Sequence, residues 1–92
     1  MTAEHAPPEP GAPATDLPVA DLAIDTSGLT CPLPILRAKK ALAGLVSGQV
    51  LKVVSTDRNA VADFQAFCRQ TGHVLLHQDV ADPIYTHYLR RR

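Results

Sequence analysis

The sequence contains few aromatic residues and no tryptophan. Two phenylalanines and two tyrosines account for an aromatic content of 4% in a chain of 92 residues. With 46% hydrophobic and 20% charged residues, the chain is long enough for one small domain and too short for two. Its core must therefore be built mainly from Val, Leu, Ile and Ala, packed between a sheet and helices.

Cysteine is also scarce: the chain contains two, Cys31 and Cys68. Two thiols without a Cys-x-x-Cys element make neither a disulfide framework nor a recognisable metal site. No segment approaches the roughly 20 apolar residues of a membrane span, and the N-terminus lacks the basic region and apolar run of a secretory signal. The sequence therefore predicts a reduced, cytoplasmic protein without a metal or a membrane contact.

The formal net charge of zero is unevenly distributed. Three of the nine acidic residues and none of the nine Lys and Arg residues lie in residues 1–20, which leaves residues 21–92 mildly positive. This excess is far below that of a dedicated nucleic-acid binder, so any contact with RNA is expected to be indirect. Residues 1–20 also hold five of the eight prolines, which predicts a disordered tail followed by one domain over residues 21–92.

The hydrophobic pattern divides residues 21–92 into six elements. Alternating or continuous apolar runs predict strands over residues 21–26, 49–55, 74–80 and 84–90, and helical spacing predicts helices over residues 32–45 and 58–71. Because crossover connections are right-handed, both helices should cover the same face of the sheet. The expected fold is an α/β (α+β) two-layer sandwich of order β-α-β-α-β-β, with a four-stranded mixed sheet and two helices on one face.

One cysteine stands where the first strand gives way to the first helix, in the run Gly28-Leu29-Thr30-Cys31-Pro32-Leu33-Pro34. Gly28 can adopt a positive φ and end the strand sharply. The two prolines are tolerated in the first turn of a helix, where amide groups lack partners. The helix N-terminus, with the amides of Leu33 and Ile35 as candidate donors, is expected to lower the pKa of the Cys31 thiol. This pattern favours a rigid, exposed and reactive nucleophile.

Other interpretations of the two thiols are open at this point. Cys31 could be a small buried hydrophobe, which is a common fate of free cysteine. Cys68 shares a predicted buried stripe with Val61 and Phe64, which favours a packing role. A redox sensor that pairs the two thiols would require them to approach disulfide distance.

Several polar residues are weaker candidates. Asp57 is placed to cap the second helix, or to shape the site around the thiol. Arg37, Lys39 and Lys40 are either solvated helix charge or a docking patch for an acidic partner. No acid–base geometry can be derived from sequence for the four histidines, which are His5, His73, His77 and His87.

Together these motifs resemble the TusA/SirA-like sulfur-carrier family. The resemblance covers residues 21–90 and rests on the Cys-Pro-x-Pro element, on Thr56-Asp57, on Phe67-Cys68 and on Gly72-His73. It implies that Cys31 accepts a persulfide from a donor protein, such as a rhodanese or a cysteine desulfurase, and passes it to an acceptor protein of DsrE type or another kind. The only group carried would be the covalent persulfide, so no separate cofactor is implied. Such a protein is a sulfurtransferase that acts as a stoichiometric carrier.

Leu33 departs from one branch of that family. Members that serve tRNA thiolation have an acidic residue between the two prolines, whereas this chain has leucine. The resemblance therefore favours sulfur metabolism with rhodanese or DsrE-type partners over tRNA thiolation. The alternative from a different functional class is a non-catalytic module that binds protein or RNA and in which Cys31 is structural.

Overall fold

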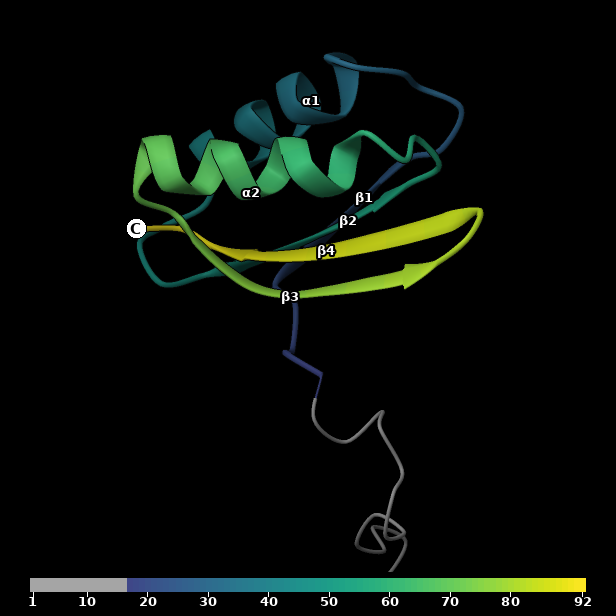
Figure 1. Ribbon diagram of the computed structural model, residues 1–92. Coiled ribbons are helices and arrows are strands. Elements are labelled where there is room, and N and C mark those ends of the chain that lie inside the picture. The colour runs from purple at the N-terminus through teal and green to yellow at the C-terminus, as the bar shows by residue number, and fades with distance from the viewer. Residues whose placement is uncertain (1–16) are drawn as a thin grey trace, which may run out of the picture.

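The computed structural model describes residues 17–92, so the predicted tail lies largely outside the described residues. The elements follow in the predicted order: β1 (Leu22–Thr26), α1 (Leu33–Ala43), β2 (Val50–Ser55), α2 (Ala60–Thr71), β3 (Val74–Ala81) and β4 (Ile84–Arg90). Both helices lie on one face of a single mixed sheet (Figure 1). The predicted two-layer α+β architecture is confirmed.

The strand order is β1-β2-β4-β3. β1 pairs with β2 in parallel, and β4 pairs antiparallel with both β2 and β3. Since β3 therefore runs in the same direction as β2, three segments meet at one end of the molecule: the β1–α1 loop, the β2–α2 loop and the β3–β4 turn (right side of Figure 1). The Cys-Pro-x-Pro motif lies at this end.

The core lies between the sheet and the two helices. It consists of Ala38 and Leu42 from α1, Ala60, Phe64 and Cys68 from α2, Leu51 and Val53 from β2, and Leu89 from β4. Fully burying an aliphatic or aromatic side chain of this size contributes roughly 1.5–3 kcal/mol. Cys68 is 6% exposed, and burial raises the pKa of its thiol to about 11. Its predicted packing role is confirmed.

The ends of the helices differ slightly from the prediction. α1 ends at Ala43, two residues early, because the amide of Gly44 turns back to the carbonyl of Ala41. α2 begins at Ala60, whose amide donates to the main-chain carbonyl of Asp57. It ends at Thr71, and the following residue, Gly72, has φ 87° as expected for a glycine that terminates a helix. Neither of these helices, the two found in residues 17–92, is long and apolar enough to cross a membrane.

A polar network crosses the core below the second helix. His87 is fully buried on β4 and lies 4.5 Å from the Phe64 ring, centroid to centroid. Its Nδ1 accepts a hydrogen bond from Nε2 of Gln78 at 3.0 Å, so the ring proton is on Nε2, which donates to Oγ of Ser55 at 3.0 Å. Nε2 of Gln78 also donates to the carbonyl of Val61. Burial lowers the pKa of His87 to about 4.

Candidate functional site

The loop that carries Cys31 is fixed to the neighbouring β2–α2 loop at its start. Gly28 has φ 82°, which confirms the predicted positive φ at this position. Its amide donates to Oγ1 of Thr56 at 2.8 Å, and the amide of Leu29 donates to the carbonyl of Thr26 at 3.1 Å. The chain therefore turns tightly at the end of β1, and the loop that follows β2 holds this turn in place.

Asp57 connects the same two loops beside the cysteine. Its Oδ2 accepts a hydrogen bond from the amide of Cys31 at 2.7 Å, and its Oδ1 accepts one from the amide of Asn59 at 3.0 Å. The N-cap position of α2 is occupied by Asn59, which makes no side-chain capping bond. The predicted capping role of Asp57 is therefore wrong, since its carboxylate is engaged by Cys31 and by the loop before the helix.

The thiol of Cys31 is exposed just before α1. Pro32 occupies the N-cap position, and the Cys31–Pro32 peptide bond is cis. The amide of Leu33, expected to face the sulfur, donates instead to the carbonyl of Thr30 at 2.8 Å. Of the two prolines, Pro34 is buried, whereas the Leu33 side chain between them is 41% exposed. The motif thus presents a thiol and an apolar side chain to solvent.

Two carboxylates raise the pKa of this thiol. A hydrogen bond to the Asp63 side chain is the main cause that raises the pKa of Cys31, followed by slight desolvation and by the negative charges of Asp63 and Asp57. The expectation of a lowered pKa is therefore wrong for the protein alone, because negative charge nearby disfavours the thiolate. Sequence reasoning did not single out Asp63. The sequence feature that could have identified Asp63 is its position in the first turn of α2, next to Phe64 but outside the buried stripe of that helix.

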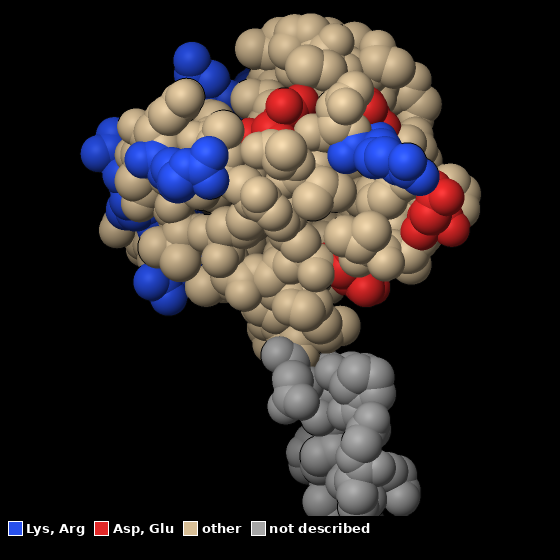
Figure 2. Space-filling view, in the orientation of Figure 1, with Lys and Arg blue, Asp and Glu red and all other residues tan. Residues whose placement is uncertain are grey.

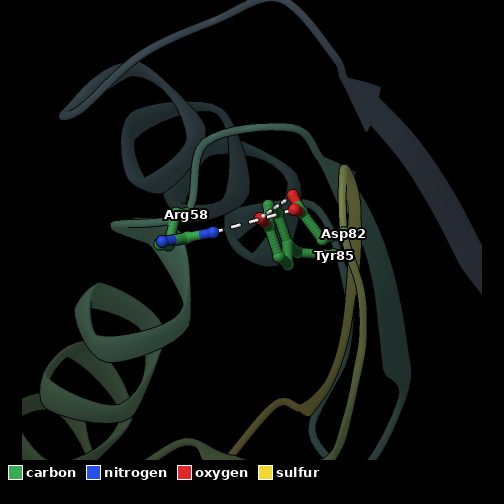
Figure 3. A network of polar contacts seen from close by, with 3 residues as sticks. All are labelled: Arg58, Asp82 and Tyr85. Atoms are coloured by element: carbon green, nitrogen blue, oxygen red, sulfur yellow. Dashed lines mark hydrogen bonds and ion pairs between the residues drawn. The ribbon is translucent and has the colours of Figure 1, made fainter.

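A second group of polar contacts closes the same end of the molecule (Figure 3). The hydroxyl of Tyr85 donates to Oδ1 of Asp82, and Arg58 lies 3.7 Å from Oδ2 of that carboxylate. Asp82 belongs to the β3–β4 turn and Arg58 to the loop before α2. Both charged side chains are mostly exposed, so this ion pair contributes little to stability. These contacts place the β3–β4 turn beside the β2–α2 loop, which holds the backbone of Cys31.

The predicted basic patch is divided between two hollows. Arg37 and Lys40 line a groove with Leu22 and Ile24 at the β1 edge. Lys39 lines a different pocket with Arg91 and Arg92.

The two thiols do not face one another. Cys68 is buried five residues beyond Asp63 on α2, which is roughly 7 Å along the helix axis, whereas Cys31 is exposed beside Asp63. This placement argues against a redox pair. Within residues 17–92 no three His, Cys, Asp or Glu side chains gather as a metal site would require.

Comparison with known proteins identifies the family. A profile described as "Sulfurtransferase TusA" matches residues 22–91. The chain belongs to the TusA family. The sulfur carrier protein TusA of Allochromatium vinosum is 59% identical over 56 residues, which cover 61% of this chain and 74% of that protein. The sulfur carrier protein TusA of Pseudomonas entomophila is 37% identical over 78 residues, which cover 85% and 96%.

The solved structures agree with this assignment. The crystal structure of the SirA-like protein from Desulfitobacterium hafniense matches with a TM-score of 0.66 at 27% identity, covering 75% of this chain and 95% of that one. The predicted resemblance to TusA/SirA-like proteins is thereby confirmed. Membership of a family of sulfur carriers implies a sulfur donor and a sulfur acceptor as partners.

Proposed function

We propose that Cys31 carries sulfane sulfur, as a persulfide, from a donor protein to an acceptor protein. The main support is the exposed thiol at the end of a loop whose backbone is held by Asp57 and Thr56. Such a thiol is reachable by a partner and still fixed in position. The proposal places the exchange in the cytoplasm, where thiols stay reduced. Residue by residue, Gly28, Pro32, Pro34 and Asp57 shape the loop.

The transfer step is a thiol–disulfide type exchange. The sulfur of Cys31 attacks the terminal sulfur of a donor persulfide, a new S–S bond forms on Cys31, and the S–S bond of the donor breaks. The donor leaves as a thiolate and gains the proton that Cys31 lost, so the protein needs no external oxidant or reductant. The same reaction in the other direction, with an acceptor thiol as the attacking group, unloads the carrier.

Mass spectrometry tests the assignment directly. After incubation with a persulfide donor, the intact protein should gain one sulfur atom, and the modified peptide should be the one that contains Cys31. The Cys31→Ser variant should stay unloaded, although it retains Cys68. Loading of Cys31→Ser would refute the assignment. A Cys31 that resists alkylation in the folded protein would support the alternative of a binding module with a structural cysteine.

For the pathway, we infer a role in sulfur metabolism with a rhodanese as donor and a DsrE-type protein as acceptor, ahead of tRNA thiolation. The supporting feature is Leu33, which is 41% exposed and lies two residues after the thiol. A partner that touches the sulfur also touches this side chain. An apolar residue at this place suits an apolar partner contact, and an acidic one would suit a different partner.

The Leu33→Glu variant tests this inference with a matched control. We expect it to accept sulfur from a rhodanese as well as the wild type does, and to deliver it to a DsrE-type acceptor more slowly. Leu36→Glu adds the same charge at another exposed apolar position of α1 and should leave delivery unchanged. Equal delivery by Leu33→Glu and wild type would contradict the inferred pathway while leaving the role of Cys31 intact.

A further inference from the structure

A second hollow lies at the opposite end of the molecule from Cys31. It has a volume of about 400 Å³ and is lined by Lys39, Leu42, Ala43, His73, Arg91 and Arg92; we refer to these six residues as the basic pocket. The helix α1 has 11 residues, from Leu33 next to the thiol to Ala43 at the pocket, and is roughly 16 Å long. Blue side chains gather at the left of Figure 2, at the end where Figure 1 labels the C-terminus, and red ones at the right.

Specific contacts position the side chains of the basic pocket. Nε of Arg91 donates to the carbonyl of Leu42 at 2.9 Å, and its Nη1 donates to the carbonyl of Arg92 at 3.2 Å. The side chain of Arg92 lies over Gly72, where an added Cβ would be 3.2 Å from Cδ of the arginine. The amide of Arg92 donates to Nδ1 of His73 at 3.1 Å. Neutral His73 therefore carries its proton on Nε2 and has this donor to offer.

Helix capping explains only part of this positive charge. Basic residues often bind the last carbonyl groups of a helix, and Arg91 does so at Leu42. Lys39 and Arg92 have no such carbonyl bond among residues 17–92, and the ion pair found there joins Arg58 and Asp82 instead. Among residues 17–92 no Asp or Glu side chain lines the basic pocket, although a main-chain oxygen of the last residue, Arg92, accepts a hydrogen bond from Arg91. Three cations thus surround one hollow without neutralisation by an acidic side chain of the described domain.

The positive charge of the basic pocket also affects the pKa of His73. Burial lowers the pKa of His73, and the charges of Arg92 and Arg91 lower it further. At neutral pH the ring is uncharged, so it adds a hydrogen-bond donor rather than a fourth cation. An anion in the basic pocket would relieve the repulsion among these groups.

We propose that the basic pocket binds a phosphate-bearing ligand, whose oxygens contact Lys39, Arg91 and Arg92 and accept a hydrogen bond from His73. The planar fork of arginine matches phosphate geometry, and lysine adds a point charge. A volume of about 400 Å³ is in the ordinary range for small-ligand sites. Because the pocket and the thiol lie at opposite ends of α1, the ligand and a sulfur-transfer partner can bind at the same time.

Inorganic pyrophosphate is the probe for the first experiment. The full-length, isotope-labelled protein is titrated with pyrophosphate at physiological ionic strength and followed by NMR. We expect the amide signals of His73, Arg91 and Arg92 to shift together and saturate, and the pKa of His73 to rise in the complex. Signals of the Cys31 loop should stay in place. Shifts scattered over all basic residues, or no saturation, would overturn the proposal.

Charge-removing variants give the control. Lys39→Gln and Arg92→Gln should each weaken pyrophosphate binding about tenfold, as expected for one charge-assisted hydrogen bond. Lys40→Gln removes the same charge from the adjacent position of α1, which lines the other groove, and should bind as the wild type does. Arg91 is left unchanged because it also caps α1. Equal weakening by Lys39→Gln and Lys40→Gln would show a diffuse charge effect and refute the pocket.

Two further ligands distinguish the source of the phosphate. If the natural ligand is a free nucleotide, ATP should compete with pyrophosphate and a short single-stranded oligonucleotide should not. If it is a polynucleotide backbone, the oligonucleotide should compete and should bind more tightly than ATP. Saturable binding of pyrophosphate with competition by neither ligand would show an adventitious anion site only and would refute the proposal.

Discussion

Acidification should destabilise this protein through one buried histidine. In the folded state His87 accepts a hydrogen bond from Gln78 at Nδ1 and donates to Ser55 from Nε2. Protonation of Nδ1 would place two donors against each other and a charge in the core. Burial accordingly lowers the pKa of His87 from its ordinary value of 6.5 to about 4.

The magnitude follows from linkage between folding and proton binding. Between pH 6.5 and about 4 the unfolded chain binds a proton that the folded chain does not. The contribution of neutral His87 to stability is therefore fully present above the pKa of the unfolded chain. It is lost as the pH falls toward the pKa of His87 in the folded protein. Each pKa unit is worth about 1.4 kcal/mol, so the full loss approaches about 3 kcal/mol, and roughly 2 kcal/mol of it should appear between about pH 7 and about pH 4.5. This is a large share of the roughly 5–15 kcal/mol of a typical domain.

Urea unfolding at a series of pH values, followed by far-UV circular dichroism because the chain has no tryptophan, measures the effect. The free energy of unfolding of wild type should fall by roughly 2 kcal/mol more than that of His87→Gln over this range. His77→Gln, which changes an exposed histidine of β3, should follow the wild type. Parallel curves for wild type and His87→Gln would refute the reasoning. If His87→Gln does not fold, NMR titration of the wild-type ring decides, since an inflection near 6.5 would contradict its burial.

Three further predictions concern the site and the core. Asp63→Asn removes the carboxylate that raises the pKa of the Cys31 thiol, so alkylation by iodoacetamide should begin at a lower pH than in wild type. Gly28→Ala places a Cβ in open space but at φ 82°, and should cost about 1–2 kcal/mol of unfolding free energy, whereas Gly44→Ala, at φ −89°, should be nearly neutral. Phe64→Ala empties a fully buried position and should cost about 3–5 kcal/mol in urea unfolding.

Matched variants control these measurements. Asp79→Asn removes a charge from an exposed position of β3, so its alkylation profile should coincide with that of wild type. Leu36→Ala truncates a side chain that is 51% exposed and should change stability by less than about 0.5 kcal/mol. An unchanged alkylation profile for Asp63→Asn would contradict its hydrogen bond to the thiol. Equal stability changes for Phe64→Ala and Leu36→Ala would contradict the assignment of the core.

Local patterns were sufficient to predict the order of elements and the face of each helix that packs on the sheet. Helical spacing placed Phe64 and Cys68 on the buried side of α2, and the short gap between the apolar runs at residues 74–80 and 84–90 corresponds to the turn between β3 and β4. The start of α2 was harder to predict from the sequence, because an aspartate before a helix usually caps it. Here that carboxylate binds an amide 26 residues earlier in the chain, a contact that depends on how β1 and β2 pair.

The protonation state of the thiol was beyond sequence reasoning for the same reason. The position of Cys31 at a helix N-terminus favours a lowered thiol pKa, and this position can be predicted from the local sequence. The opposing carboxylate of Asp63 comes from the other helix and reaches Cys31 because β1 and β2 run parallel, which places the loops after both strands at the same end of the sheet. Which effect dominates depends on tertiary distances, which no spacing of residues along the chain specifies.

The hydrogen bonds around Cys31 form a closed ring. Asp57 joins the amide of Cys31 to that of Asn59, the carbonyl of Asn59 accepts from the amide of Asp63, and the Asp63 side chain returns to the thiol. These contacts tie the cysteine loop to the start of α2, so a partner that displaces the loop must also shift or break the contact with the carboxylate that raises the pKa of the thiol. A partner that separates Asp63 from the thiol would lower the pKa of Cys31 and so favour the thiolate that sulfur transfer requires.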